Sequence, residues 1–226
     1  MAVYDDTYMM NPSRKLFAAS VTHMDAGIGK ILEALDHKGI RQNTLIIFTS
    51  DNGGQRSWHS KTEYRGKYAD KPHRVLGNNF PLRGWKGDLY EGGIRVPAFV
   101  NWPGRLAPRV VDDPIHVSCW LPSLCYLTGC DESLKDMKID GRNIWPLLTG
   151  NRMEGREFPI YWKTNQYYAV REGRWKLLVN RKTDVTELYD LEEDFREITD
   201  LSEENPQKTK HLLELLESFK KDDREK

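Results

Sequence analysis

The sequence Thr44-Leu-Ile-Ile-Phe-Thr-Ser50 runs directly into Asp51-Asn52-Gly53-Gly54. The first part is a continuous run of β-branched, aromatic and other apolar residues, which predicts a strand buried on both faces. In α/β sheets, ligands bind in the crevice beyond the carboxyl ends of the strands, where Asp51 and Asn52 are expected. A carboxylate beside an amide oxygen suits a hard divalent cation, and the glycines permit a sharp turn. A strand that simply ends in an Asn-Gly turn would give the same pattern.

A long amphipathic helix is expected before this strand. Apolar residues recur at three- and four-residue intervals from Arg14 to His37, and Gly39 follows as a stop signal. Helix, short turn and buried strand together form half of a doubly wound α/β unit. After the strand, residues 52–82 are mostly polar. Such a segment is either a solvated insertion or a functional loop, here the rim of a pocket for an anionic substrate.

A second motif follows the polar segment. It reads Pro81-Leu-Arg-Gly-Trp-Lys86 and leads into Glu91-Gly-Gly-Ile-Arg95-Val-Pro97. A lysine in a glycine-rich loop is usually just solvated, but its place after a strand-end carboxylate makes Lys86 a candidate anion ligand. Glu91 and Arg95 are expected to form a supporting ion pair, and structural roles are expected for them and for Arg83.

The strand ending in Asp51-Asn52-Gly53, the Lys86 motif, the Glu91 motif and Leu188-Tyr-Asp-Leu191 together resemble the formylglycine-dependent sulfatases of the arylsulfatase type. The resemblance implies an α/β, alkaline-phosphatase-like fold with a mixed, mainly parallel sheet flanked by helices. In that family the Asp and Asn bind the active-site divalent cation, usually Ca²⁺, and the lysine contacts the sulfate group. These roles map to Asp51, Asn52 and Lys86. The implied activity is hydrolysis of sulfate monoesters in a sulfated small molecule or a sulfated glycan.

Part of the family's machinery has no match in this chain. The family makes its formylglycine from a cysteine or serine within Cys/Ser-x-Pro-x-Arg. Met10-Asn-Pro-Ser-Arg14 is similar, but a thioether cannot become the aldehyde, so Arg14 is better interpreted as the first turn of the long helix. The family also supplies further metal-binding aspartates from its first strand. We therefore expect the chain to be the C-terminal half of a sulfatase, inactive alone, with the missing N-terminal half as a partner.

The pattern of the sequence changes near residue 152. Residues 1–152 are expected to form the C-terminal part of the α/β catalytic domain, and residues 153–226 a small antiparallel sheet with a C-terminal helix. A strand is predicted from Ile94 to Trp102, and a helix from His116 to Gly129 with Ser118 as its N-cap. In the second part, aromatic and β-branched segments predict strands at Pro159–Trp162, Tyr167–Glu172, Arg174–Asn180 and Thr186–Tyr189, and leucines predict a helix around Leu212–Phe219.

Three cysteines lie close together at Cys119, Cys125 and Cys130. Their odd number and spacing fit neither a disulfide framework nor a zinc site, so small buried hydrophobic side chains are expected. The family usually carries an aspartate where this chain has Cys119, which removes a charge near the periphery of the site.

Composition limits the classes of function. The formal net charge is zero and the pI is about 7.0, so no overall basic field favours nucleic acid. The sequence contains no apolar stretch long enough for a membrane span and no signal peptide at Met1. The family resemblance implies a periplasmic, secreted or lysosomal location. Two alternatives stay open: a phosphate-transferring relative of the same superfamily, and a non-catalytic domain that binds anions or a partner on the same scaffold.

Overall fold

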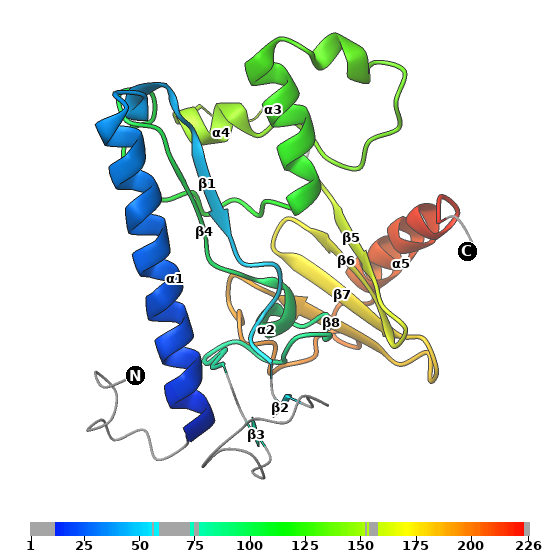
Figure 1. Ribbon diagram of the computed structural model, residues 1–226. Coiled ribbons are helices and arrows are strands. Elements are labelled where there is room, and N and C mark those ends of the chain that lie inside the picture. Colours follow the sequence, from blue (N-terminus) through cyan, green and yellow to red (C-terminus); the bar gives the residue numbers. More distant parts are fainter. Residues whose placement is uncertain are drawn as a thin grey trace.

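The computed structural model describes residues 12–55, 57–58, 73–74, 77–151, 153 and 158–223 (Figure 1). The polar segment predicted to rim a pocket lies largely outside the described residues, and so does the start of the Met10–Arg14 sequence. The first part of the chain forms α1 (Pro12–His37), η2 (Arg41–Asn43), β1 (Ile46–Thr49), β2 (Ser57–Trp58), β3 (His73–Arg74), α2 (Glu91–Ile94), β4 (Ala98–Asn101), η3 (Val117–Cys119), α3 (Trp120–Thr128), η4 (Asp131–Leu134) and α4 (Trp145–Thr149).

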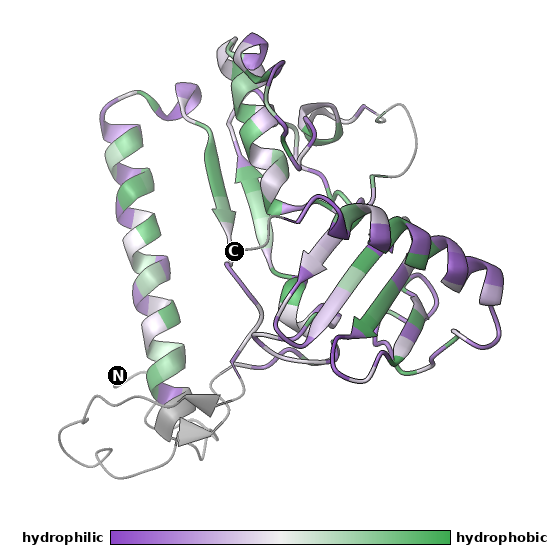
Figure 2. Cartoon of the chain, turned by 90° about the vertical axis from the view of Figure 1, so that its right-hand side faces the viewer, coloured by the Kyte–Doolittle hydropathy of each residue, from purple (hydrophilic) through white to green (hydrophobic). Residues whose placement is uncertain are grey.

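Strand β1 pairs antiparallel with β4, and Phe48 stacks on Phe99 with 4.9 Å between the ring centroids. The expectation that this strand is buried on both faces is wrong for the chain as described. β1 is only partly buried and Phe99 is exposed, because β4 is the one strand that pairs with β1 among the described residues. Figure 2 shows apolar and polar bands alternating along α1. The apolar side chains of Phe17 and Ile31 on this helix are exposed, so the part of the chain that the structure describes does not cover them.

All strand pairs among the described residues are antiparallel, so none of the parallel pairs that the resemblance implies is among them. The strand predicted from Ile94 begins later, at Ala98. Ile94 instead ends the short helix α2, where the N–H of Arg95 donates to the carbonyl oxygen of Glu91 at 2.7 Å. Pro97 then separates the helix from the strand, because proline restricts the residue before it to an extended conformation.

The C-terminal part matches its sequence pattern closely. Strands β5 (Ile160–Lys163), β6 (Tyr167–Glu172), β7 (Trp175–Asn180) and β8 (Thr186–Asp190) form one antiparallel sheet in chain order, and helix α5 (Pro206–Lys220) follows. Side chains alternate between the two faces of the sheet. One face packs against α5 through Val170, Leu177, Leu188, Leu212 and Leu216. The other face packs Ala169, Leu178 and Tyr189 against Leu89 and Tyr90 of the second motif. The C-terminal sheet therefore supports the segment that follows Lys86.

The helical region around α3 has its own core of Cys119, Ile144, Leu147 and Leu148. Gly129 ends α3 in the left-handed conformation, with φ of 72°, as the sequence predicts. Ser118 is not the N-cap, because it lies within η3, and the N-cap position of α3 is Cys119, whose side chain makes no capping hydrogen bond. The side chain of His116 caps η3 instead: its Nδ1 accepts from the Ser118 N–H and lies 2.8 Å from Ser118 Oγ.

The three cysteines are free thiols. Cys119 is buried, as expected for a small apolar side chain, but Cys125 is only partly buried and Cys130 is exposed. Among the described helices, none is long and apolar enough to cross a membrane.

Candidate active site

The end of β1 turns sharply at Ser50. The Ser50 N–H donates to the carbonyl oxygen of Pro97 at 3.1 Å, and Ser50 Oγ donates to the carbonyl oxygen of Asn52 at 3.0 Å. The Asn52 side-chain NH₂ donates to Gly53 O at 2.8 Å. Asp51 is exposed and Asn52 is half-buried. The carboxylate of Asp51 and the amide of Asn52 therefore stand just after β1.

Two backbone hydrogen bonds join this turn to the second motif. The Gly53 N–H donates to Gly93 O at 2.9 Å, and the Lys86 N–H donates to Gly54 O at 3.0 Å. The structure thus brings the backbone of Lys86 next to the turn that carries Asp51. Lys86 is itself exposed.

Asn79 clamps the same turn through its side chain. Its Oδ1 accepts from the Gly54 N–H at 2.7 Å, and its NH₂ donates to Gly54 O at 3.2 Å and to Gly84 O at 3.0 Å. One amide therefore ties the strand end to the motif loop, defined here as residues 83–93. Sequence reasoning did not assign this role, and the one available signal was that Asn79 stands just before the Lys86 motif.

The motif loop is close-packed because its glycines carry no Cβ. A Cβ at Gly93 would lie 2.2 Å from Asp88 O, and one at Gly92 would lie 2.5 Å from Arg83 O. The Trp85 N–H also donates to Asp88 Oδ2 at 2.8 Å. The Gly-Gly pair is therefore required for backbone to approach backbone.

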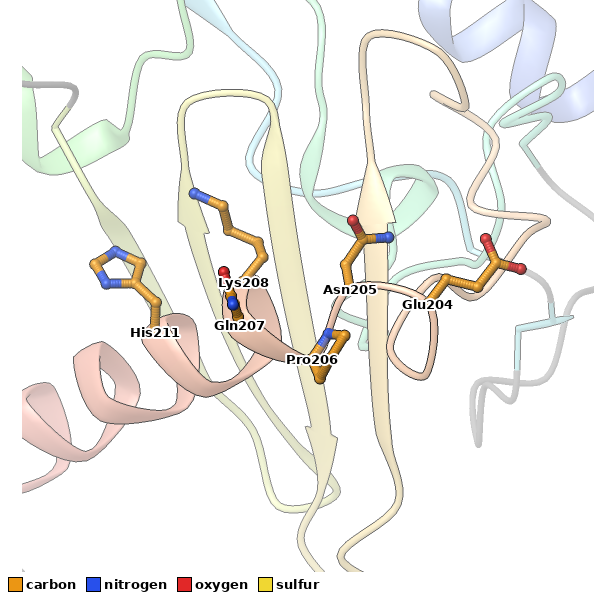
Figure 3. A pocket seen from close by; sticks show the side chains of 6 residues that line it. All are labelled: Glu204, Asn205, Pro206, Gln207, Lys208 and His211. Atoms are coloured by element: carbon orange, nitrogen blue, oxygen red, sulfur yellow. The ribbon is translucent and has the colours of Figure 1, made fainter.

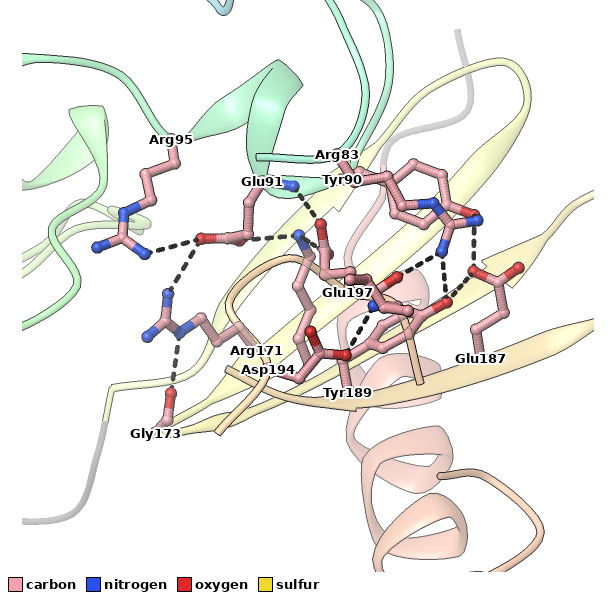
Figure 4. Close-up of polar contacts among 12 residues, drawn as sticks. Arg83, Tyr90, Glu91, Arg95, Arg171, Gly173, Glu187, Tyr189, Asp194 and Glu197 are labelled. Atoms are coloured by element: carbon pink, nitrogen blue, oxygen red, sulfur yellow. Dashed lines mark hydrogen bonds and ion pairs between the residues drawn. The ribbon is translucent and has the colours of Figure 1, made fainter. Parts of the chain in front are cut away.

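Arg83 anchors the start of the loop on the C-terminal sheet (Figure 4). Its guanidinium donates to Tyr189 Oη at 2.8 Å, to Glu197 O at 2.7 Å and to Tyr90 Oη at 3.1 Å. Both tyrosine hydroxyls in turn donate to Glu187 Oε2, at 2.6 and 2.9 Å. Burial, and then the nearby Glu187 carboxylate, raise the pKa of both tyrosines well above their ordinary value, so both remain neutral donors.

A buried ion cluster anchors the other end of the loop. Lys176 Nζ on β7 lies 2.9 Å from Glu91 Oε1 and 2.8 Å from Glu197 Oε1. All three side chains are inaccessible to solvent or nearly so, and burial raises the pKa of Glu197 while the Lys176 charge opposes that rise. Arg95 lies 3.8 Å from Glu91 Oε2, so the predicted pair is present but long. Lys176 is the closer partner, and the sequence did not reveal it because it lies on a distant strand.

The oxygen atoms of Asp51 and Asn52 would fit part of the ligand set of a cation site. Ca²⁺ takes six to eight oxygen ligands, and Asp51 and Asn52 provide ligands of the right kind but too few. Among the described residues, no cluster of three or more His, Cys, Asp and Glu side chains is placed to hold a metal. A surface hollow at the start of α5 contains none of the predicted site residues (Figure 3). It is lined by Glu204, Asn205, Pro206, Gln207, Lys208 and His211.

The chain is similar to several known proteins in sequence and in fold. Steryl-sulfatase of Mus musculus is 36% identical over 160 residues, 70% of this chain and 24% of the mouse protein. Arylsulfatase A of Homo sapiens is 33% identical over 165 residues, 71% of this chain and 29% of the human protein. The solved structure of Ps i-CgsB in complex with k-i-k-neocarrahexaose has a TM-score of 0.80 and 30% identity, over 96% of this chain and 45% of that chain.

The chain spans less than half the length of each of these proteins. The structural match confirms the predicted α/β, sulfatase-like fold. The family model for the N-sulphoglucosamine sulphohydrolase C-terminal region matches residues 84–224, and the sulfatase family model matches residues 2–130. The motifs, the fold and both matches agree, and the chain belongs to the sulfatase family.

Proposed function

We propose that this chain is the C-terminal part of a metal-dependent sulfuric ester hydrolase. In this proposal Asp51 and Asn52 bind a divalent cation, with Ca²⁺ as the expected ion, and Lys86 contacts the sulfate group of the substrate. The observation that carries the proposal is the hydrogen bond from the Lys86 N–H to Gly54 O, which ties the lysine to the turn bearing the two oxygen ligands.

Each residue has a defined chemical task in this arrangement. The bound cation would neutralise negative charge on the sulfate oxygens. Lys86, a compact ammonium on a flexible stem, would bind a sulfate oxygen as a point charge and orient the ester. The clamp made by Asn79 and the glycine contacts of the loop would hold both groups in place, so that little reorganisation is needed when the ester breaks.

The nucleophile is proposed to come from outside these residues. No Cys/Ser-x-Pro-x-Arg pattern occurs in the sequence. We propose that the formylglycine and the remaining metal ligands come from the N-terminal half of the sulfatase, and that this half covers the apolar residues which α1 and β4 leave exposed. Phe17, Ile31 and Phe99 are among those residues. The isolated chain is then inactive because no covalent step is available.

The proposed substrate is a sulfate monoester of a sulfated glycan or a sulfated small molecule. Ps i-CgsB, the structural match at 30% identity, was solved with the oligosaccharide k-i-k-neocarrahexaose, which supports a sugar substrate. The family resemblance extends the proposal to a periplasmic, secreted or lysosomal location.

A chromogenic aryl sulfate tests the activity. The purified chain with Ca²⁺ should show no turnover, and a complete polypeptide that adds a formylglycine-bearing N-terminal half should hydrolyse the ester. Turnover by the isolated chain above a Lys86→Ala control would overturn the proposed division of the site. A complete polypeptide that carries formylglycine, binds metal and cleaves neither aryl sulfates nor sulfated oligosaccharides would overturn the proposed activity.

A further inference from the structure

Glu197 joins the C-terminal sheet to both ends of the motif loop (Figure 4). Its side chain is fully buried. Glu197 Oε1 accepts from Lys176 Nζ at 2.8 Å, and Oε2 accepts from the Glu91 N–H at 2.6 Å. Its carbonyl oxygen accepts from Arg83 Nη1 at 2.7 Å. One residue thus holds the first residue of the loop through its backbone and the start of α2 through its side chain.

The backbone around Glu197 is shaped for this contact. Glu197 has a φ of 57°, in the left-handed region that residues with a Cβ seldom adopt. The turn is closed by Asp194, whose carboxylate accepts from the Ile198 N–H at 2.6 Å and the Thr199 N–H at 2.8 Å. An unfavourable conformation at a buried charged residue indicates that the surrounding contacts hold the side chain in one place.

Lys86 lies between the two anchors that Glu197 provides. Arg83 precedes it and Glu91 follows it in the motif loop, and the Lys86 N–H is hydrogen-bonded to Gly54 O in the turn that follows Asp51. A displacement of either anchor would shift the lysine relative to Asp51, and such small displacements cost catalysis heavily. We propose that Glu197 is a positioning residue that acts through Lys86, an inference that rests on the proposed function of that lysine.

Hydrogen exchange on the chain tests the geometry without any activity. Glutamine in place of Glu197 keeps the shape but supplies a single oxygen, which cannot satisfy both Lys176 and the Glu91 N–H. The Glu197→Gln variant should exchange the Glu91 and Lys86 amides about 10- to 100-fold faster, with little change in β6 and β7. The matched control is Glu192→Gln, since Glu192 is exposed and pairs with Arg174 at 2.9 Å. Unchanged Glu91 and Lys86 amides in a folded Glu197→Gln protein would overturn the proposal.

A second variant keeps the test decisive if Glu197→Gln does not fold. Arg83→Lys leaves the buried Lys176 cluster intact and removes the forked contacts at the start of the loop. It should also raise exchange at Lys86 while the sheet stays protected. Exchange that rises equally throughout the chain, or not at all in the loop, would show that these anchors do not position Lys86.

Kinetics in the complete enzyme test whether Glu197 acts through Lys86. Glu197→Gln should lower kcat with little effect on KM, and should cause almost no further loss when Lys86 is already alanine. Equal losses in both backgrounds would show a general structural role and overturn the inference. A wild-type enzyme without sulfatase activity would instead overturn the proposed function. The hydrogen-exchange experiment would then still test whether Glu197 holds the motif loop in place.

Discussion

Gly53 and Gly92 come so close that a Cβ built on Gly53 would lie 1.8 Å from the carbonyl oxygen of Gly92. The two glycines belong to different motifs, one at the end of β1 and one at the start of α2. Their contact is where the candidate metal ligands and the lysine loop meet backbone to backbone. A methyl group at this point has no space unless one of the two segments moves.

Gly53→Ala should therefore destabilise the protein by about 1–3 kcal/mol or more, because overpacking forces backbone shifts. Gly27→Ala is the matched control, since Gly27 lies within α1 and a Cβ there meets nothing within 4 Å. That control should stabilise by up to about 1 kcal/mol, the difference in helix propensity between glycine and alanine. Denaturant unfolding measures both changes, and equal effects of the same sign would contradict the close contact.

Lys86→Ala in the complete enzyme should reduce kcat by about 100- to 1000-fold, the cost of losing a well-placed charged donor to the transition state. Folding and metal content should stay normal, because the Lys86 side chain is exposed. Lys182→Ala, another exposed lysine on the hairpin after β7, should leave kcat unchanged. Rate, melting temperature and bound metal measured on the same preparations separate a catalytic lysine from a structural one, and near-normal turnover would remove Lys86 from the site.

The isolated chain should bind Ca²⁺ no more tightly than about the millimolar range, because two protein oxygens leave most of the coordination sphere to water. Equimolar Ca²⁺ should then raise the free energy of unfolding by well under about 1 kcal/mol. Calorimetric titration of the chain and of its Asp51→Ala variant measures this affinity. A micromolar site that disappears in Asp51→Ala would show that the chain supplies more ligands than Asp51 and Asn52.

Acid should destabilise the region around α3 through His116. Burial lowers the pKa of His116 below its ordinary value of 6.5, and the charge of Asp140 only partly opposes this. The unfolded chain therefore binds a proton that the folded chain does not, so stability falls as the pH drops from 6.5 to the lowered pKa. Thermal unfolding between pH 7 and pH 5 should show this loss, and His116→Asn should reduce the slope. An unchanged slope in the variant would assign the pH dependence to other groups.

Local pattern was a good guide to much of the fold. The spacing of apolar residues predicted α1 and α5, and the alternation in residues 159–190 predicted the four strands of the C-terminal sheet almost to the residue. These elements follow from short-range periodicity, which a sequence displays directly. Ile94 was misassigned because it ends α2, whose Gly92 and Gly93 pack against backbone atoms of Arg83 and Asp88. Such a tertiary contact leaves no trace in the local periodicity of the sequence.

Asp51, Asn52 and Lys86 became candidate site residues from the sequence because each stands in a motif with its own chemistry. The motifs do not reveal what holds these residues together. Asn79, Lys176 and Glu197 make contacts with residues far from them along the chain. A buried lysine on a strand has no local signal, since its partners are defined only when the sheet packs on the motif loop.

The sequence by itself determined the helices, the C-terminal strands, the family and the candidate site residues, because these depend on periodicity and on short motifs. The tertiary structure alone decided that the backbone of Lys86 lies beside the Asp51 turn. It also decided that Glu197 contacts both ends of the motif loop that carries Lys86. Those relationships arise from backbone contact at Gly53 and from burial of the Lys176 charge, and both depend on residues brought together only by folding.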